Sequence, residues 1–198
     1  MTRTKVPLWR AVLFLVVACA GCAIDLGTKS WIFDKLKMPY ENPPIVLIPG
    51  IFSLTTSLNE GALFGMGQGM TPIFAALSLL AVLGIAYWLF FIGAGNDLWL
   101  VVALGLIMGG IFGNLYDRLG FPGLIWNQPN NAGQPVYAVR DWLHFEIQRL
   151  KFDWPVFNIA DSLLVTGAIM LFVHVAWREP RQRAAGRAKA AAPASKAV

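Results

Sequence analysis

Four long apolar runs divide the chain, and they cover residues 8–24, 72–95, 98–116 and 159–177. Each run is close to the ~20 residues that a helix needs to cross the hydrocarbon core of a membrane. None shows the strict alternation of apolar and polar residues that is typical of a membrane β-barrel. Because a backbone inside lipid must satisfy its own hydrogen bonds, the pattern predicts four transmembrane helices.

The connections between these runs differ in length and character. Residues 93–97 form a tight link, whereas residues 26–71 and 119–157 are long. Residues 45–57 are rich in β-branched and aromatic side chains and suit short strands. Residues 139–154 are rich in Trp, Phe and Leu, which is typical of a segment at the membrane interface. We therefore expect an all-α membrane protein with four transmembrane helices, a small extracytoplasmic β-rich subdomain and an interfacial loop or helix.

The whole pattern indicates one integral membrane domain over residues 1–177. Residues 178–198 are basic and Ala-rich, and we expect them to form a disordered cytoplasmic tail. The N-terminal tail is basic as well, and four spans place both tails on one side. By the positive-inside rule, we expect both termini to be cytoplasmic and the two long connections to be extracytoplasmic.

Composition narrows the class of protein further. Hydrophobic residues make up 57% of the 198 residues and charged residues only 14%, against about 25% charged in a typical soluble domain. Disorder and nucleic-acid binding are therefore excluded as main roles. The net charge of +5 comes from nine Lys/Arg and two acids on the cytoplasmic side, against seven Lys/Arg and nine acids on the other side. The excess of basic residues is thus mainly a signal of orientation.

The first apolar run permits two other interpretations. Cys19 and Cys22 form a C-x-x-C motif, but no βαβ pattern surrounds it, so packing is favoured over redox chemistry. The sequence Ala20-Gly21-Cys22 after a basic start imitates the cleavage site of a lipoprotein. Position 19, however, holds Cys where a lipoprotein usually has Leu, and three more spans follow.

Polar residues gather at the ends of the four runs that face the extracytoplasmic side. Such residues at a membrane edge are costly and are candidates for function. Asp25 and Lys29 are spaced i,i+4 and can pair, and Asn158 and Asp161 are spaced i,i+3 on one helix face. The set, with Asp141 reaching it from the second connection, is Asp25, Lys29, Asn59, Gly61, Asn114, Asp117, Arg118, Asp141, Asn158 and Asp161.

The residue types in this set point to carboxylate chemistry. The chain has no H-E-x-x-H zinc motif and no G-x-S-x-G nucleophile motif, so we expect neither a metal nor a cofactor. Two neighbouring aspartates cannot both ionise cheaply, and a pair that shares one proton can activate water and polarise an amide carbonyl. These residues alone do not rank Asp141 above Asp117 as a member of such a pair.

Five ordered motifs carry a family resemblance. They are Asp25-Leu-Gly-Thr-Lys29, Asn59-Glu-Gly-Ala-Leu-Phe-Gly65, Gly109-Gly-Ile-Phe-Gly-Asn-Leu-Tyr-Asp-Arg118, Val139-Arg-Asp-Trp142 and Phe157-Asn-Ile-Ala-Asp161. In this order, on four helices, they resemble bacterial lipoprotein signal peptidase (signal peptidase II). The resemblance implies an intramembrane aspartic endopeptidase that cuts prolipoproteins just before a diacylglyceryl-modified cysteine. It further implies contact with membrane lipids and inhibition by globomycin-type peptides.

The resemblance also implies roles for the individual residues. Asp141 and Asp161 match the catalytic aspartates, whereas Asp117, Asn114 and Arg118 match a supporting motif. The remaining matches, which shape the pocket, are Asp25, Lys29, Asn59, Gly61 and Asn158. Two departures stand out: Trp142 replaces a common Phe, and 23 residues separate Asp117 from Asp141 where the family has a short connection. We expect this insertion to enlarge an extracytoplasmic flap over the site.

Two alternatives from other classes stay open at this point. A small transporter would use the polar cluster as an ion pathway, although the second and third runs carry no charge near their middle. A structural protein would use the same residues only to hold helices together. No strong dimer motif stands out in the apolar runs, so we expect a monomer.

Overall fold

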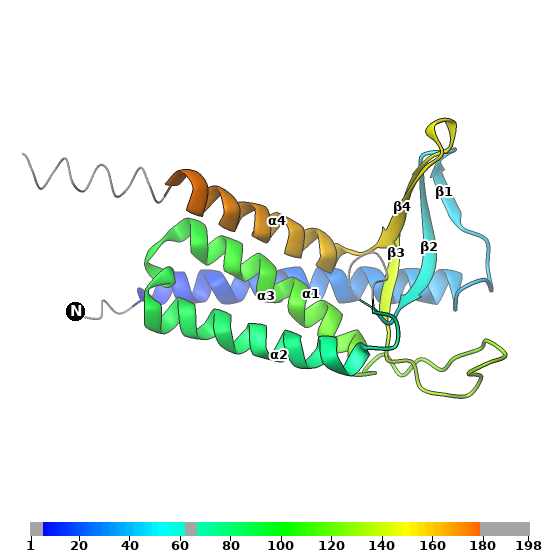
Figure 1. The fold of residues 1–198 in the computed structure, drawn as a ribbon, viewed down its shortest axis with the longest axis horizontal. Coiled ribbons are helices and arrows are strands. Elements are labelled where there is room, and N and C mark those ends of the chain that lie inside the picture. The colour runs from blue at the N-terminus through cyan, green and yellow to red at the C-terminus, as the bar shows by residue number, and fades with distance from the viewer. Residues whose placement is uncertain (1–5, 62–66, 179–198) are drawn as a thin grey trace, which may run out of the picture.

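Four long helices and one antiparallel sheet make up the computed structural model, which describes residues 6–61 and 67–178 (Figure 1). The helices are α1 (Leu8–Leu36), α2 (Thr71–Tyr87), α3 (Leu98–Arg118) and α4 (Ile159–Val173). π-Helical turns η2 (Trp88–Ile92) and η5 (His174–Arg178) extend α2 and α4, and the short turn η3 (Ala94–Asn96) leads into α3. With these extensions, all four helices are long and apolar enough to cross a membrane, which confirms the four predicted spans.

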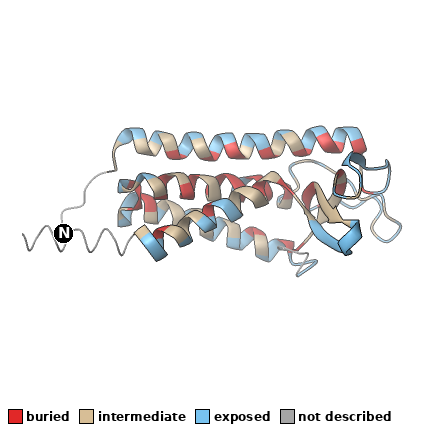
Figure 2. Cartoon of the chain, turned by 90° about the horizontal axis from the view of Figure 1, so that it is seen from above, coloured by how far each residue is buried: buried red, intermediate tan, exposed pale blue. Residues whose placement is uncertain are grey.

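Helix α3 is the centre of the bundle. In its most apolar stretch 67% of the residues are buried, against 22%, 11% and 17% in the spans of α1, α2 and α4. The outer helices α1, α2 and α4 expose many large apolar side chains. Figure 2 shows exposed positions along the outer faces of the bundle. An outward apolar face suits lipid rather than water, so the packing supports the membrane assignment independently of hydropathy.

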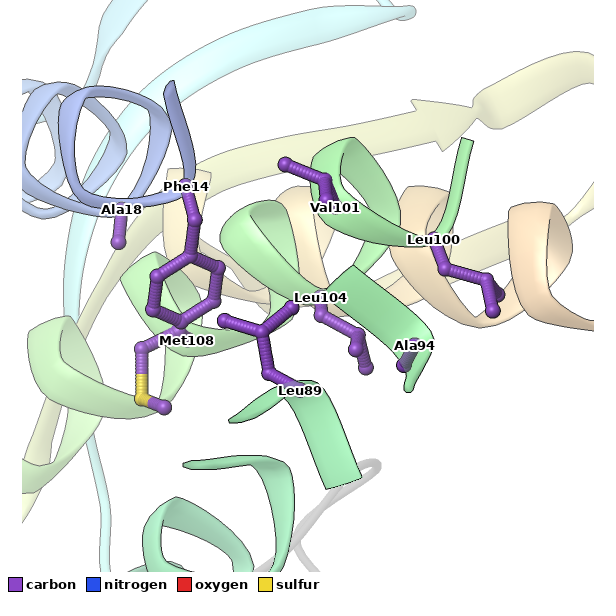
Figure 3. Close-up of a cluster of buried hydrophobic side chains, with 8 residues drawn as sticks. All are labelled: Phe14, Ala18, Leu89, Ala94, Leu100, Val101, Leu104 and Met108. Carbon is purple, nitrogen blue, oxygen red and sulfur yellow. The ribbon is translucent and has the colours of Figure 1, made fainter. Parts of the chain in front are cut away.

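A cluster of apolar side chains fills the bundle at the end away from the sheet (Figure 3). Phe14 and Ala18 of α1 meet Leu104 and Met108 of α3, and Leu89 of η2 is fully buried among them. This half of the bundle is held by dispersion and close packing, since lipid tails are as apolar as the side chains themselves.

The sheet lies at the opposite end of the bundle and has the strand order β1-β2-β3-β4. Its strands are β1 (Ile45–Ile48), β2 (Phe52–Asn59), β3 (Val139–Ile147) and β4 (Phe152–Phe157), and the short turn η4 (Gln148–Leu150) links the last two. The strands at residues 45–57 were predicted. The loop or helix predicted over 139–154 is instead β3 and part of β4, because these residues pair with β2 and with each other, whereas their place at the membrane interface stays a prediction. Their β-branched and aromatic side chains suit strands.

Helix α1 runs twelve residues beyond its apolar run and thereby reaches the sheet. Its last turns bury Ile32, Phe33 and Leu36 against Leu54 of β2 and Trp142 of β3. The extension fixes the sheet on the bundle and places β3 beside the ends of α1 and α3. Residues 179–198, nearly all of the predicted tail, lie outside the described residues.

Two adjacent glycines allow the close approach of the outer helices to α3. A Cβ atom at Gly110 would lie 2.6 Å from the carbonyl oxygen of Ala160 on α4, and one at Gly109 would lie 2.9 Å from that of Ala18 on α1. Small residues at such positions let helix backbones approach within a membrane.

We expect Gly110→Ala to lower the thermal unfolding midpoint in detergent, at a cost of about 1–3 kcal/mol, because α3 and α4 must separate. Gly84→Ala on α2 is the matched control, since no atom lies within 4 Å of its added Cβ. Equal midpoints for both variants would contradict this packing account.

Candidate active site

All ten predicted site residues lie at the sheet end of the bundle and belong to one connected network of hydrogen bonds and ion pairs. They come from the end of α1, the end of β2, the end of α3, the start of β3 and the start of α4. The predicted gathering of these positions is therefore confirmed.

The Lys29 ammonium group is the centre of the network. Its Nζ atom lies 2.7 Å from Oδ2 of Asp25, 3.0 Å from Oδ2 of Asp117 and 2.9 Å from Oδ1 of Asn114. Lys29, Asp25 and Asp117 are all completely buried. The ammonium thus makes two ion pairs with carboxylates and one hydrogen bond with an amide oxygen, which is the kind of pairing that a buried cation requires, and the predicted Asp25–Lys29 pair is confirmed.

Each of the two carboxylates bound to Lys29 also holds a second element. Asp25 Oδ1 accepts a hydrogen bond of 2.8 Å from the backbone N–H of Ala160, at the start of α4. Asp117 accepts from both the backbone N–H and the Nε of Arg140, at 3.1 and 2.9 Å. Sequence reasoning missed Arg140. The sequence does show that Arg140 directly precedes Asp141, and this position could have indicated its role. A residue that anchors β3 at this point also positions the aspartate that follows it.

Two asparagines connect this buried centre with Asp141 and Asp161. Asn114 accepts from Lys29 and donates to Asp161 Oδ1 at 2.9 Å. Asn158 donates to Asp141 Oδ1 at 2.5 Å and to Asn114 Oδ1 at 3.2 Å. The side-chain amides therefore hold the two carboxyl groups next to each other, although β3 and α4 bring them from separate parts of the fold.

Asn158 and Asp161 also form the N-terminal cap of α4. The Asn158 side chain accepts from the backbone N–H of Asp161 at 2.9 Å, and Asp161 Oδ2 accepts from the backbone N–H of Asn158 at 3.2 Å. This reciprocal arrangement is a capping box. It fixes the Asp161 carboxyl at the positive end of a helix, where a negative charge is favoured.

The remaining residues close the site from the β2 side. Asn59 donates to Asp141 Oδ2 at 3.2 Å and accepts from the backbone N–H of Gly61 at 2.9 Å. Arg118 donates to the carbonyl of Gly61 at 2.9 Å and lies over the ring of Phe74. Arg118 thus ties the segment after β2 to the end of α3.

A small cleft opens against the two aspartates, and we call it the aspartate cleft. Its volume is about 40 Å³, and it is lined by Asn59, Asn114, Arg118, Val139, Asp141, Trp154, Pro155, Val156, Phe157 and Asp161. A single water needs about 10–15 Å³ of such volume, so the cleft has room for a water but not for a peptide. Of the 23 residues between Asp117 and Asp141, only Arg118 at the end of α3 and Val139 at the start of β3 line it. The connection at 119–138 does not, so the flap expected over the site is not seen among the described residues.

The environment of Asp141 favours its protonated form. Burial and, after it, the charge of Asp161 raise the pKa of Asp141 to about 8, against the smaller opposing effect of the Asn158 hydrogen bond. Because two neighbouring carboxyl groups cannot both ionise cheaply, a proton held here belongs to the pair. Such a pair can accept a proton from water while donating a hydrogen bond to a carbonyl.

Other chemistries find little support in the side chains present. Within residues 6–61 and 67–178, no group of three His, Cys, Asp or Glu side chains is placed to hold a metal ion. His144 pairs with Asp153 on the sheet, and His174 pairs with Asp97 at the other end of the bundle. The two histidines are therefore too far apart to act together.

Known proteins share both the sequence and the fold. Residues 17–177 match the family model described as Signal peptidase (SPase) II. A lipoprotein signal peptidase of Rhodopirellula baltica is 47% identical over 84% of this chain and 73% of its own length. One of Bacillus pumilus is 33% identical over 83% of this chain and 92% of its own length.

Two solved structures of bacterial membrane enzymes, determined by the in meso method, have the same fold. One has a TM-score of 0.67 at 22% identity and covers all of this chain and 99% of the other. The second has a TM-score of 0.66 at 23% identity and covers 89% of this chain and 99% of the other. From the sequence match over most of its length, the chain is a multi-pass membrane protein that belongs to the lipoprotein signal peptidase (signal peptidase II) family.

Proposed function

We propose that the protein is an aspartic endopeptidase that removes signal peptides from diacylglyceryl-modified prolipoproteins, cutting just before the lipid-bearing cysteine. The observation that carries this proposal is the pairing of Asp141 and Asp161. Asn158 and Asn114 hold the two carboxyl groups beside the aspartate cleft, at the sheet end of the bundle. Family membership supports the same activity.

In the mechanism that we propose, Asp141 and Asp161 hold the attacking water between them. Asp161, at the start of a helix and with donors on both oxygens, acts as the base that removes a proton from the water. Asp141, whose pKa is raised to about 8, is protonated and donates a hydrogen bond to the scissile carbonyl. The water oxygen attacks the carbonyl carbon, and the proton taken up by the pair then passes to the leaving amine.

The position of the network supports a protease over an ion pathway. The ten residues lie at one end of the bundle, and the half away from the sheet is filled by the apolar cluster around Leu89 and Leu104. We further propose that this end faces the extracytoplasmic side, with both termini cytoplasmic and the protein monomeric. The basic tails support this orientation.

We expect Asp141→Asn and Asp161→Asn each to reduce cleavage of a diacylglyceryl-modified prolipoprotein peptide by at least about a thousandfold. Asn keeps the shape of the side chain but cannot share the proton. Mass spectrometry of the products locates the cut, which is expected directly before the modified cysteine and is expected to be blocked by globomycin.

Asp34→Asn is the control for these variants, because Asp34 is an exposed carboxyl on α1. Its activity should equal that of the unchanged protein. An Asp141 or Asp161 variant with an unchanged unfolding midpoint that still cleaves at a normal rate would refute the proposed pair.

The alkaline side of the activity profile tests the shared proton. Since cleavage needs one proton on the pair, we expect kcat/KM to fall as pH rises through about 8, the pKa of Asp141. The Asn59 hydrogen bond lowers this pKa, so Asn59→Ala should move the fall to higher pH. Asn130→Ala, on an exposed loop, should leave it in place. A profile that is flat to pH 10 would contradict the mechanism.

A further inference from the structure

A second and much larger cavity adjoins the aspartate cleft, and we call it the outer cavity. Its volume is about 790 Å³, and five separate parts of the chain line it. They are residues 39–44 after α1, residues 55–58 of β2, Trp126 and Gln128 of the insertion, His144 of β3 and Val156 of β4. Val156 also lines the aspartate cleft, so this residue borders both spaces.

The insertion supplies a fixed wall for the outer cavity. Backbone hydrogen bonds of 2.9 and 3.0 Å join Trp126 to Gln134 and to Gly133, so this part of the loop forms a hairpin. Asn127 donates to Glu41 at 2.6 Å, which fastens the hairpin to the segment after α1. Asn127 is one of the 23 residues between Asp117 and Asp141, so the insertion itself supplies this wall.

The segment after α1 carries an unpacked aromatic ring beside the outer cavity. Tyr40 lines the cavity and is 94% exposed, and its backbone has a φ of 71°. A bulky residue with positive φ is strained, and such strain is concentrated at sites that contact ligands. Tyr40 and Trp126 thus offer two aromatic surfaces to an occupant.

Strand β2 presents an open side to the same space. Its pairing with β1 ends at Leu54, where Ile45 lies opposite. Beyond that point, residues 55–58 have no strand of the described residues on the β1 side, and these four residues line the outer cavity. An open strand side next to pockets for side chains is the arrangement by which proteins bind extended peptides.

We propose that the outer cavity binds, as an extended polypeptide, the substrate segment that follows the lipid-bearing cysteine. This inference rests on the proposed function. The signal peptide is apolar and lies in the membrane, so the segment on the other side of the cut is the part that leaves the aspartate cleft away from lipid. Ser57 lies opposite Asp141 in the sheet, which places the open side of β2 close to the cut.

The geometry also sets how far the segment must extend. A peptide added on the open side of β2 would lie about two strand spacings, or about 10 Å, from β3, and extended residues cover about 3.3 Å each. About three residues after the cysteine therefore cross to the outer cavity, and later residues occupy it. A substrate that ends one residue after the cysteine cannot reach Trp126 or Tyr40.

Two synthetic diacylglyceryl-modified peptides test this inference with the full-length protein in detergent. They share one signal sequence, and one ends a single residue after the cysteine whereas the other continues for eight. We expect the longer peptide to have a KM about tenfold lower at similar kcat. We expect Trp126→Ala and Tyr40→Ala to raise the KM of the longer peptide alone, and Asn130→Ala, on the same loop but outside the cavity, to change neither.

The outcomes separate the inference from the function on which it rests. Cleavage of the short peptide with no KM advantage for the longer one would overturn the inference and leave the proposed function intact. Equal losses for both peptides in Trp126→Ala would also overturn it, since that result indicates a general disturbance of the fold. Failure of the unchanged protein to cut either peptide would overturn the proposed function and this inference with it.

Discussion

The arrangement of the site depends on one buried cation. Lys29 lies beyond the apolar run of α1, toward the sheet, with no exposed surface, and is bound by Asp25, Asp117 and Asn114. Removing an ammonium and two carboxylates from water costs several kcal/mol per ion, which only close and complete pairing offsets. That requirement restricts the helix ends to the arrangement in which all three partners reach Lys29.

The same restriction positions the two aspartates proposed to cut the substrate. Asp25 uses its second oxygen to bind the start of α4, which bears Asp161, and Asp117 binds Arg140, the residue before Asp141. Asn114 accepts from Lys29 and donates to Asp161. Neither proposed catalytic carboxyl is paired with Lys29, so the cation positions them through its partners, while its charge lowers the pKa of Asp141 against the raising effect of burial.

Much of this was predictable from the sequence. The four spans follow from hydropathy, and the i,i+4 and i,i+3 spacings correctly placed Asp25 with Lys29 and Asn158 with Asp161. The ranking of Asp141 above Asp117 came from the family resemblance, because spacing carries no information on which carboxyl lines a cleft. In the structure Asp117 is saturated by Lys29 and Arg140, whereas Asp141 lines the aspartate cleft.

The missed features depend on contacts between distant segments. Residues 139–154 are amphipathic enough for a membrane interface, and only the presence of β2 as a partner makes them strands. The insertion was expected over the site, but the hydrogen bond between Asn127 and Glu41 places it at the outer cavity. No local pattern indicates a contact across so many residues.

The unfolding free energy of Lys29→Met tests most directly whether the buried cation organises this end of the molecule. Met fills similar space without charge and leaves Asp25 and Asp117 buried without their shared partner. The account predicts a loss of about 3–5 kcal/mol together with loss of cleavage, whereas Lys35→Met, at an exposed position on α1, changes neither. A Lys29→Met protein as stable and as active as the unchanged chain would contradict it.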